Sequence, residues 1–131
     1  MVTSSKTALG ALAMACGLLV MNPGLSHASV PLGQEYFGVA SWYGSAFKGL
    51  RTANGEKFNP KALTAAHPTL PFGTLVEVSR PDRKKSVVVC ITDRGPFTGR
   101  AIDLSRAAAR RLHMSYLGTA PVRIQVIGMV E

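Results

Sequence analysis

Alternation of apolar and polar residues predicts short β-strands along most of the chain after residue 35. Segments 37–43, 62–67, 73–79 and 86–91 are rich in β-branched, aromatic or alternating apolar residues, and segment 121–127 alternates most cleanly. Gly and Pro residues separate these segments, as is typical of turns. The pattern therefore predicts about five or six short strands joined by loops.

One segment has the composition of an α-helix. Residues 106–112 contain three consecutive alanines followed by two arginines, which suit a helix interior and a helix C-terminus respectively. Asp103 or Ser105 is expected to provide the N-cap of this helix. Capping accounts for the residue type at Asp103, so a structural role is preferred there to a catalytic one.

The expected architecture is mainly β, a small closed barrel with one or two short helices. A closed barrel leaves no strand edge exposed, which suits a domain of this size. The domain is expected to cover residues 36–131. It follows a linker over residues 29–35, in which Pro31 and Gly33 disfavour regular structure.

The first 28 residues predict a secretory signal peptide. Lys6 precedes an apolar run over residues 8–21, and small residues lead to Ala28, after which cleavage is expected. The run is shorter than the roughly 20 residues that a spanning helix needs, so no membrane span is expected after cleavage. A secreted or periplasmic location follows. Cys16 leaves an alternative open, a lipoprotein anchored through this cysteine.

Charge restricts the class of partner. Removal of residues 1–28 leaves 14 basic and 7 acidic residues, a net charge of +7. An exported basic domain suits anionic polymers such as peptidoglycan, teichoic acids or lipid head groups, and export argues against nucleic acid as the partner. His67 and His113 stand apart from other ligand residues, so neither a metal nor a cofactor is expected. A monomer is expected.

A carboxylate follows the most apolar predicted strand. Asp93 and Arg94 follow segment 86–91 after Thr92, and a Gly-Pro turn ends the strand. This order places a charged pair at the mouth of the barrel, where loops on a rigid scaffold often carry function. Glu56 follows an Asn-Gly turn, and His67 precedes a proline. His67 has two interpretations that stay open, a site residue or a hydrogen-bonded histidine of a turn.

Six motifs occur in a fixed order. They are Ala-Ser-Trp-Tyr-Gly at 40–44, Arg-Thr-Ala-Asn-Gly-Glu-Lys-Phe at 51–58, Leu-Thr-Ala-Ala-His at 63–67, Leu-Pro-Phe-Gly-Thr at 70–74, Asp-Arg-Gly-Pro-Phe at 93–97 and Ile-Asp-Leu-Ser at 102–105. Together they resemble the RlpA family, the rare lipoprotein A-like lytic transglycosylases. The resemblance extends from about residue 38 to residue 127.

The resemblance implies a six-stranded double-psi β-barrel. It also implies a lyase that cleaves peptidoglycan glycan strands between N-acetylmuramic acid and N-acetylglucosamine and leaves a 1,6-anhydro end, in wall remodelling or daughter-cell separation. By motif, Asp93 is the implied catalytic acid, with Glu56 and His67 as its partners. No glycan-binding repeat of the SPOR type follows Glu131, so targeting to septal glycan is not expected.

The same motifs imply residues that contact the substrate. These are Trp42, Tyr43, Thr52, Asn54 and Arg94. Side chains of neighbouring residues in an extended segment point to opposite faces, so at most one of the two aromatic residues is expected to line the groove.

A lytic transglycosylase uses the C6 hydroxyl of its own substrate as the nucleophile. One carboxyl group can then donate a proton to the glycosidic oxygen and afterwards accept the C6 hydroxyl proton. Asp93 is expected to do this, with Glu56 favouring its protonated form by repulsion and Arg94 opposing it. Two other classes stay open: a non-catalytic wall-binding or wall-loosening module similar to expansins, and an inhibitor-like barrel that binds through its basic surface.

Overall fold

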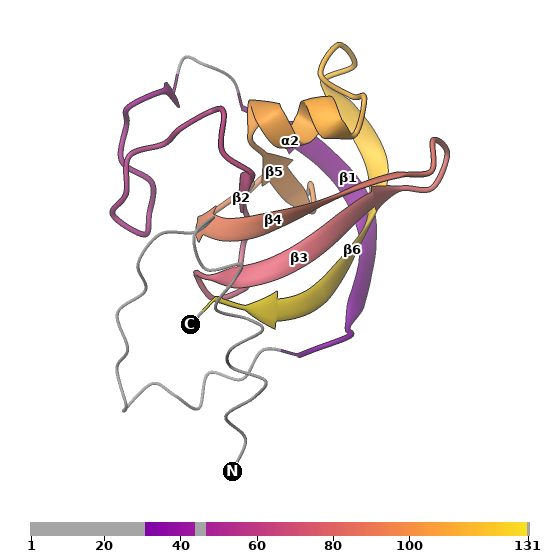
Figure 1. The fold of residues 1–131 in the computed structure, drawn as a ribbon, viewed down its shortest axis with the longest axis horizontal. Coiled ribbons are helices and arrows are strands. Elements are labelled where there is room, and N and C mark those ends of the chain that lie inside the picture. The colour runs from indigo at the N-terminus through magenta and orange to yellow at the C-terminus, as the bar shows by residue number, and fades with distance from the viewer. Residues whose placement is uncertain (1–30, 44–46, 131) are drawn as a thin grey trace.

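The computed structural model describes residues 31–43 and 47–130 of the 131-residue chain. In these ranges the chain forms one β-barrel with a short helix packed beside it (Figure 1). The predicted signal peptide, its cleavage site after Ala28 and the alternative lipid-attachment site at Cys16 lie outside the described residues. No helix of the described ranges has the length and hydrophobicity to cross a membrane.

Six strands close the barrel in the order β1-β5-β2-β4-β3-β6. Two of the six neighbouring pairs, β1 with β5 and β2 with β4, are parallel, and the other four are antiparallel. This is the strand order of a double-psi β-barrel, so the predicted fold class is confirmed. The elements are β1 (Glu35–Trp42), β2 (Thr64–Ala66), β3 (Thr74–Arg80), β4 (Lys85–Asp93), β5 (Ile102–Leu104), α2 (Arg106–Arg111) and β6 (Thr119–Met129).

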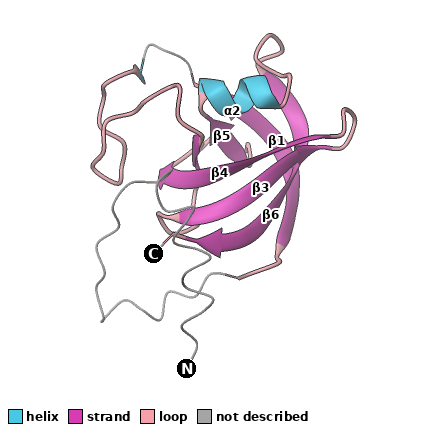
Figure 2. Ribbon diagram, in the orientation of Figure 1, coloured by secondary structure: helices cyan, strands magenta, loops and turns pink. Residues whose placement is uncertain are grey.

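Five strands lie where the hydrophobic pattern predicts them, and β5 does not come from that pattern. Its three residues are too few for alternation to be recognised, and the strand forms because β1 and β2 supply hydrogen-bonding partners on either side. Long connections, between β1 and β2 and between β4 and β5, leave the barrel as loops (Figure 2). These loops and the strand ends beside them build the site described below.

Ser105 caps α2, and the expectation that Asp103 serves as its cap is wrong. The Ser105 hydroxyl accepts a hydrogen bond from Ala108 N at 3.2 Å and donates one to Ala62 O at 2.6 Å. Asp103 instead belongs to β5, between the fully buried side chains of Ile102 and Leu104. Because strand side chains alternate, these two neighbours fill the core and Asp103 points the other way.

A buried arginine ties the β3–β4 hairpin to the end of α2. Arg80 is 2% exposed, and its Nη1 donates to Leu112 O at 3.2 Å and to His113 O at 2.8 Å. Its Nη2 also lies 2.9 Å from the exposed carboxylate of Asp82. The guanidinium therefore satisfies two carbonyls that the helix end leaves without partners.

Replacing Arg80 by Ala is expected to lower the free energy of unfolding by about 2 to 4 kcal/mol, because two carbonyls and Asp82 lose their donor and a void remains. Arg83→Ala, in the same turn but exposed, is the control and should change the free energy by less than about 0.5 kcal/mol. Urea unfolding of the two variants measures the difference. Equal effects would show that Arg80 is no anchor.

Candidate functional site

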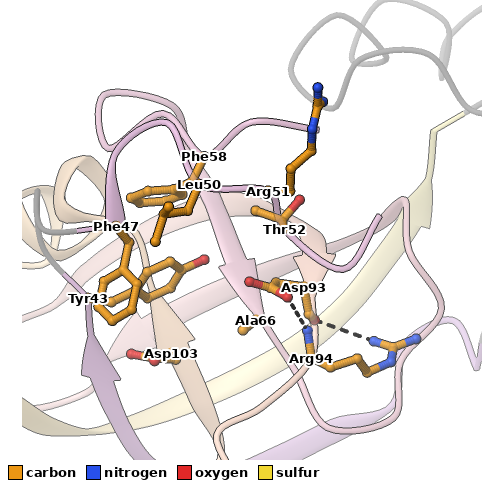
Figure 3. Close-up of a pocket in the computed structure, with 10 residues that line it drawn as sticks. All are labelled: Tyr43, Phe47, Leu50, Arg51, Thr52, Phe58, Ala66, Asp93, Arg94 and Asp103. Carbon is orange, nitrogen blue, oxygen red and sulfur yellow. Dashed lines mark hydrogen bonds between the residues drawn. The ribbon is translucent and has the colours of Figure 1, made fainter. Parts of the chain in front are cut away.

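A cavity of about 230 Å³ lies between the barrel and the loop that joins β1 to β2 (Figure 3). Its lining combines aromatic and apolar side chains with two carboxylates and two arginines. The lining residues are Tyr43, Phe47, Leu50, Arg51, Thr52, Phe58, Ala66, Asp93, Arg94 and Asp103. An apolar wall with a small number of convergent charged groups is typical of a ligand site.

Strand register brings Asp93 and Asp103 to the two sides of Ala66. Ala66 on β2 pairs with Asp93 on β4 and with Asp103 on β5. Neighbouring strands lie about 4.8 Å apart, so the Cα atoms of the two aspartates are separated by roughly two strand spacings. The side chain between them is only a methyl group, which leaves room for a ligand (Figure 3).

A β-bulge produces this alignment. The β2–β4 register shifts between Ala65 and Ala66, so that Ala65 pairs with Ile91 and Ala66 pairs with Asp93. Regular pairing would place Thr92 opposite Ala66 and turn the Asp93 side chain to the other face of the sheet. The bulge therefore directs Asp93 into the cavity, a common use of bulges beside functional sites.

The Asp93 carboxylate is fixed by backbone donors. Its Oδ1 accepts hydrogen bonds from Ala53 N and from Arg94 N, both at 2.9 Å. Asn54 N donates to Thr92 O at 3.1 Å and holds the donor loop against β4. Two backbone N–H donors on one oxygen hold the carboxylate in a fixed orientation at the cavity.

Asp103 has the opposite environment. Burial raises the pKa of the Asp103 carboxyl above its ordinary value. The hydrogen bond from Ser41 Oγ to Asp103 Oδ1, 3.1 Å, and the charge of Arg100 lower this pKa, whereas the charge of Asp93 raises it further. The net shift of the Asp103 pKa is upward, so this carboxyl holds a proton to higher pH than an ordinary aspartate. Two carboxyls with such different surroundings are typical of acid-base sites.

The Tyr43 hydroxyl is a free donor inside this cavity. Burial raises the pKa of Tyr43, and the charges of Asp93 and Asp103 raise it further, so the phenol stays protonated. Its oxygen is buried, and no hydrogen-bond partner lies within the described part of the chain. The ring packs on Phe58, with centroids 4.6 Å apart. Trp42 packs against the barrel core instead, as alternation predicts for the neighbour of a cavity residue.

Arg94 is held in place at the cavity edge. Its guanidinium lies 4.1 Å from the ring centroid of Phe72, a favourable cation–π contact. Its Nη1 donates to His67 O at 3.2 Å and to Asp93 O at 3.4 Å. These contacts give the cavity a fixed positive charge close to Asp93.

His67 does not line the cavity. Its Nδ1 accepts hydrogen bonds from Thr69 N at 3.1 Å and Leu70 N at 3.0 Å, so the ring closes the turn after β2. Burial, with a smaller contribution from Arg94, lowers the pKa of His67 to about 4. The ring is therefore neutral at physiological pH. The backbone of His67 acts on the site instead, because its N donates to Asp93 O at 3.1 Å and its O accepts from Arg94.

Glu56 and Asn54 also lie outside the cavity lining, and Thr52 lies in it. Asn54 Oδ1 accepts from Glu56 N at 3.1 Å, and Asn54 Nδ2 donates to Glu56 Oε1 at 3.3 Å. Thr52 Oγ1 donates to Glu56 O at 3.0 Å and to Asn54 Oδ1. These bonds shape the turn that presents Ala53 N to Asp93. Within the described ranges no group of three or more His, Cys, Asp or Glu residues could hold a metal.

Because the buried ring of His67 is neutral, the free energy of unfolding is expected to depend on pH. The folded-state pKa of about 4 is below the ordinary value of 6.5, so only the unfolded chain takes up a proton as the pH falls between these values. The contribution of the neutral His67 ring to the free energy of unfolding is on the order of 3 kcal/mol. It is fully present above pH 6.5 and is lost as the pH falls toward 4. His67→Asn, whose Oδ1 can accept the same backbone bonds, should lack this loss.

Urea unfolding at pH 7 and pH 4.5 measures the effect as the difference between wild type and His67→Asn. Other titrating groups cancel in this difference. A difference that does not change with pH would contradict the neutral buried ring.

Asp103 is the main site residue that sequence reasoning missed. A polar residue between two core residues is a signal for it, but capping gave a sufficient explanation of its residue type. The aromatic and aliphatic wall was also missed, because residues 47–58 lack the periodicity of a strand or a helix. That wall includes Phe47, Leu50 and Phe58.

Comparison with known proteins adds to this geometry. Residues 36–124 match the sequence profile of a family described as lytic transglycolase. Over 100 residues the chain is 50% identical to the endolytic peptidoglycan transglycosylase RlpA of Campylobacter jejuni, which covers 76% of this chain and 36% of that protein. Over 97 residues it is 60% identical to a probable endolytic peptidoglycan transglycosylase RlpA of Nostoc sp., covering 72% of this chain and 26% of that protein. The chain thus spans about a third or less of these relatives.

A solved structure shares the fold at low sequence identity. The Streptomyces papain inhibitor superposes with a TM-score of 0.63 at 24% identity, over 76% of this chain and 99% of the inhibitor. This likeness concerns the barrel and not the chemistry of the site.

Proposed function

Since this chain belongs to the lytic transglycolase family, we propose that it cleaves peptidoglycan glycan strands between N-acetylmuramic acid and N-acetylglucosamine and leaves a 1,6-anhydro end. The observation that carries the proposal is the pair of carboxyls, Asp93 and Asp103, which face one cavity from opposite sides of Ala66 and differ in their surroundings. The predicted signal peptide would deliver the domain to the wall, in the periplasm or outside the cell. Such an enzyme serves wall remodelling or daughter-cell separation.

In the first step Asp103 acts as general acid. The protonated carboxyl donates its proton to the glycosidic oxygen, the bond from this oxygen to C1 of the muramyl residue breaks, and the leaving N-acetylglucosamine gains a hydroxyl. Burial supports this role, because it raises the pKa of Asp103 and keeps a proton available.

In the second step the C6 hydroxyl of the same muramyl residue attacks C1. The new C6–O–C1 bond closes the anhydro ring, and the hydroxyl proton passes to the Asp103 carboxylate. Asp103 is then protonated again, so no water is consumed. This sequence needs one proton-transferring carboxyl where ordinary glycosidases need two.

Asp93 is proposed as the partner carboxylate that faces the sugar. Positive charge develops at C1 while the glycosidic bond breaks, and a fixed negative charge stabilises it. The donors Ala53 N and Arg94 N hold the carboxylate in place. The sequence motif points to Asp93 as the acid, whereas the burial that raises the pKa of Asp103 supports Asp103 in that role.

The other motif residues have proposed roles that follow from their contacts. Tyr43, Thr52 and Arg94 line the cavity and are placed to bind sugar hydroxyls. Asn54 and Glu56 hold the turn that carries Ala53 N. The residues proposed as supports from outside the cavity are His67, which holds Arg94 and Asp93 through its backbone, and Trp42, which packs against the barrel core.

Mass spectrometry of the products from purified sacculi tests the proposed reaction. Digestion in water enriched in ¹⁸O should release muropeptides with anhydro ends and no incorporated ¹⁸O. Reducing ends that carry ¹⁸O would identify a hydrolase. An absence of new ends, with the protein bound to the sacculi, would favour the expansin-like alternative and contradict the proposal.

A further inference from the structure

Two more cavities lie beyond the catalytic cavity, on the surface between the β1–β2 loop and α2. The nearer cavity, about 390 Å³, shares Phe58 with the catalytic cavity. The farther cavity, about 360 Å³, shares Lys48, Pro60 and Lys61 with the nearer one. The three cavities are therefore neighbours on this side of the molecule, with the buried ring of Phe58 between the first and the second.

Basic side chains dominate the lining of the two outer cavities, and no acidic residue is part of it. All six basic residues are exposed, and in the described ranges none of their side chains forms an ion pair or a hydrogen bond. We call them the basic groove. They are Lys48, Lys57, Lys61, Arg106, Arg110 and Arg111.

The groove is built on fixed backbone. Ala107 N, in the first turn of α2, donates to Pro60 O at 3.0 Å and joins the helix to the loop. Arg106 and Arg110 stand one turn apart on α2 and lie on the same face as each other. Six cations without acidic partners repel one another and cost stability, so their clustering indicates an anionic ligand for this face.

We propose that the basic groove binds carboxylates carried by the glycan strand whose scissile bond lies in the catalytic cavity. The proposal rests on the proposed function, because it extends the same substrate past Phe58 toward α2. The sugar rings of the strand are neutral. Its negative charge lies on the lactyl group of each muramyl residue, either as a free lactyl carboxylate or as the carboxylates of an attached peptide.

Charge and position together favour this ligand over a separate partner. The groove is lined by cations and lies next to the catalytic cavity, on the other side of Phe58, so a strand that extends out of that cavity carries its carboxylates toward these cations. The groove therefore contributes affinity to the strand while the cavity performs the chemistry, and removal of its charge should weaken binding and not the chemical step.

Binding is tested in the full chain with the Asp103→Asn substitution, so that the substrate is not consumed. The groove variant adds Lys61→Gln, Arg106→Gln and Arg110→Gln. The matched control adds Arg83→Gln, Lys84→Asn and Lys85→Gln in the β3–β4 turn, where Asn suits the positive φ of 54° at Lys84. Both variants lose three positive charges, and thermal unfolding confirms that both remain folded.

Pull-down at low salt uses intact sacculi, amidase-stripped glycan strands, and sacculi whose carboxyls have been converted to methylamides. The groove variant should bind the first substrate roughly tenfold more weakly than the parent, and the control should change binding much less. The methylamide sacculi should bind parent and groove variant equally. Weaker binding to the stripped strands as well shows that the groove also binds the free lactyl carboxylate, which those strands carry; weakening confined to intact sacculi assigns the peptide carboxylates alone.

Equal weakening in the groove variant and the control would overturn the proposal, since net charge alone would explain binding. If the groove variant bound more weakly than its parent only to vesicles of anionic phospholipid, the proposal would also be overturned, and the groove would be assigned to a membrane surface. Binding is read without turnover, so these results stand apart from the product analysis: wild type that yields no anhydro ends refutes the proposed reaction and leaves the carboxylate test intact.

Discussion

Replacing Asp103 by Asn is expected to slow the release of anhydro-muropeptides from sacculi by about 10²- to 10⁴-fold, the usual contribution of a general acid. The amide has the size of the carboxyl and can still accept the bond from Ser41 Oγ, but it has no proton to give to a leaving group. The loss should appear in kcat, because the proton moves only during the chemical step.

The same substitution is expected to leave the fold intact. Burial penalises the ionised form of Asp103, so a neutral side chain at this position should unfold at an equal or higher temperature near neutral pH. Glu77→Gln on β3, which removes a carboxyl outside the cavity, is the control and should keep full activity. A folded Asp103→Asn protein with more than about a tenth of wild-type activity would remove Asp103 from the chemical step.

Asp93→Asn is expected to have the second largest effect, with a loss of roughly 10²-fold and a displaced pH profile. The amide oxygen can keep the bonds from Ala53 N and Arg94 N, but the negative charge that faces C1 is gone. The charge of Asp93 also raises the pKa of Asp103. Without it the pKa of Asp103 falls, and the basic limb of kcat/KM against pH should move to lower pH.

The pH profile separates a catalytic charge from a structural one. Glu56→Gln changes a carboxyl that lies outside the cavity lining. The basic limb of kcat/KM against pH in this variant should therefore coincide with that of the wild type, even if the turn is disturbed. If Asp93→Asn leaves the basic limb unchanged, or moves it to higher pH, the two aspartates do not act on each other as the geometry requires.

The strands and the helix could be predicted because their residues follow local rules, but the pairing of strands could not. Alternation locates β3 and β6, the continuous run of β-branched residues locates β4, and the alanines locate α2. The two-residue alternation of apolar and polar side chains does not show that β2 inserts between β4 and β5. This insertion puts Asp93 and Asp103 on either side of Ala66. The bulge after Ala65, which directs Asp93 into the cavity, likewise depends on a partner strand distant in sequence.

The candidate site divides in the same way. The alternation of side chains at the end of β1 correctly predicts that Trp42 and the next residue, Tyr43, point to opposite sides, because side-chain direction in extended backbone is a local property. Motif membership gives no such information about His67 and Glu56, whose side chains are occupied by hydrogen bonds in their own turns. Their link to the cavity is through the backbone, which residue type alone does not disclose.

The central claim, that burial and the neighbouring Asp93 raise the pKa of Asp103 so that Asp103 carries the proton, is tested most directly by a ¹³C NMR titration of the aspartate carboxyls in the wild type and in Asp93→Asn. The midpoint for Asp103 should lie above the ordinary aspartate pKa of about 3.9 and should fall in the variant. A midpoint for Asp103 at or below that ordinary value, or one that does not respond to Asp93→Asn, would contradict the claim.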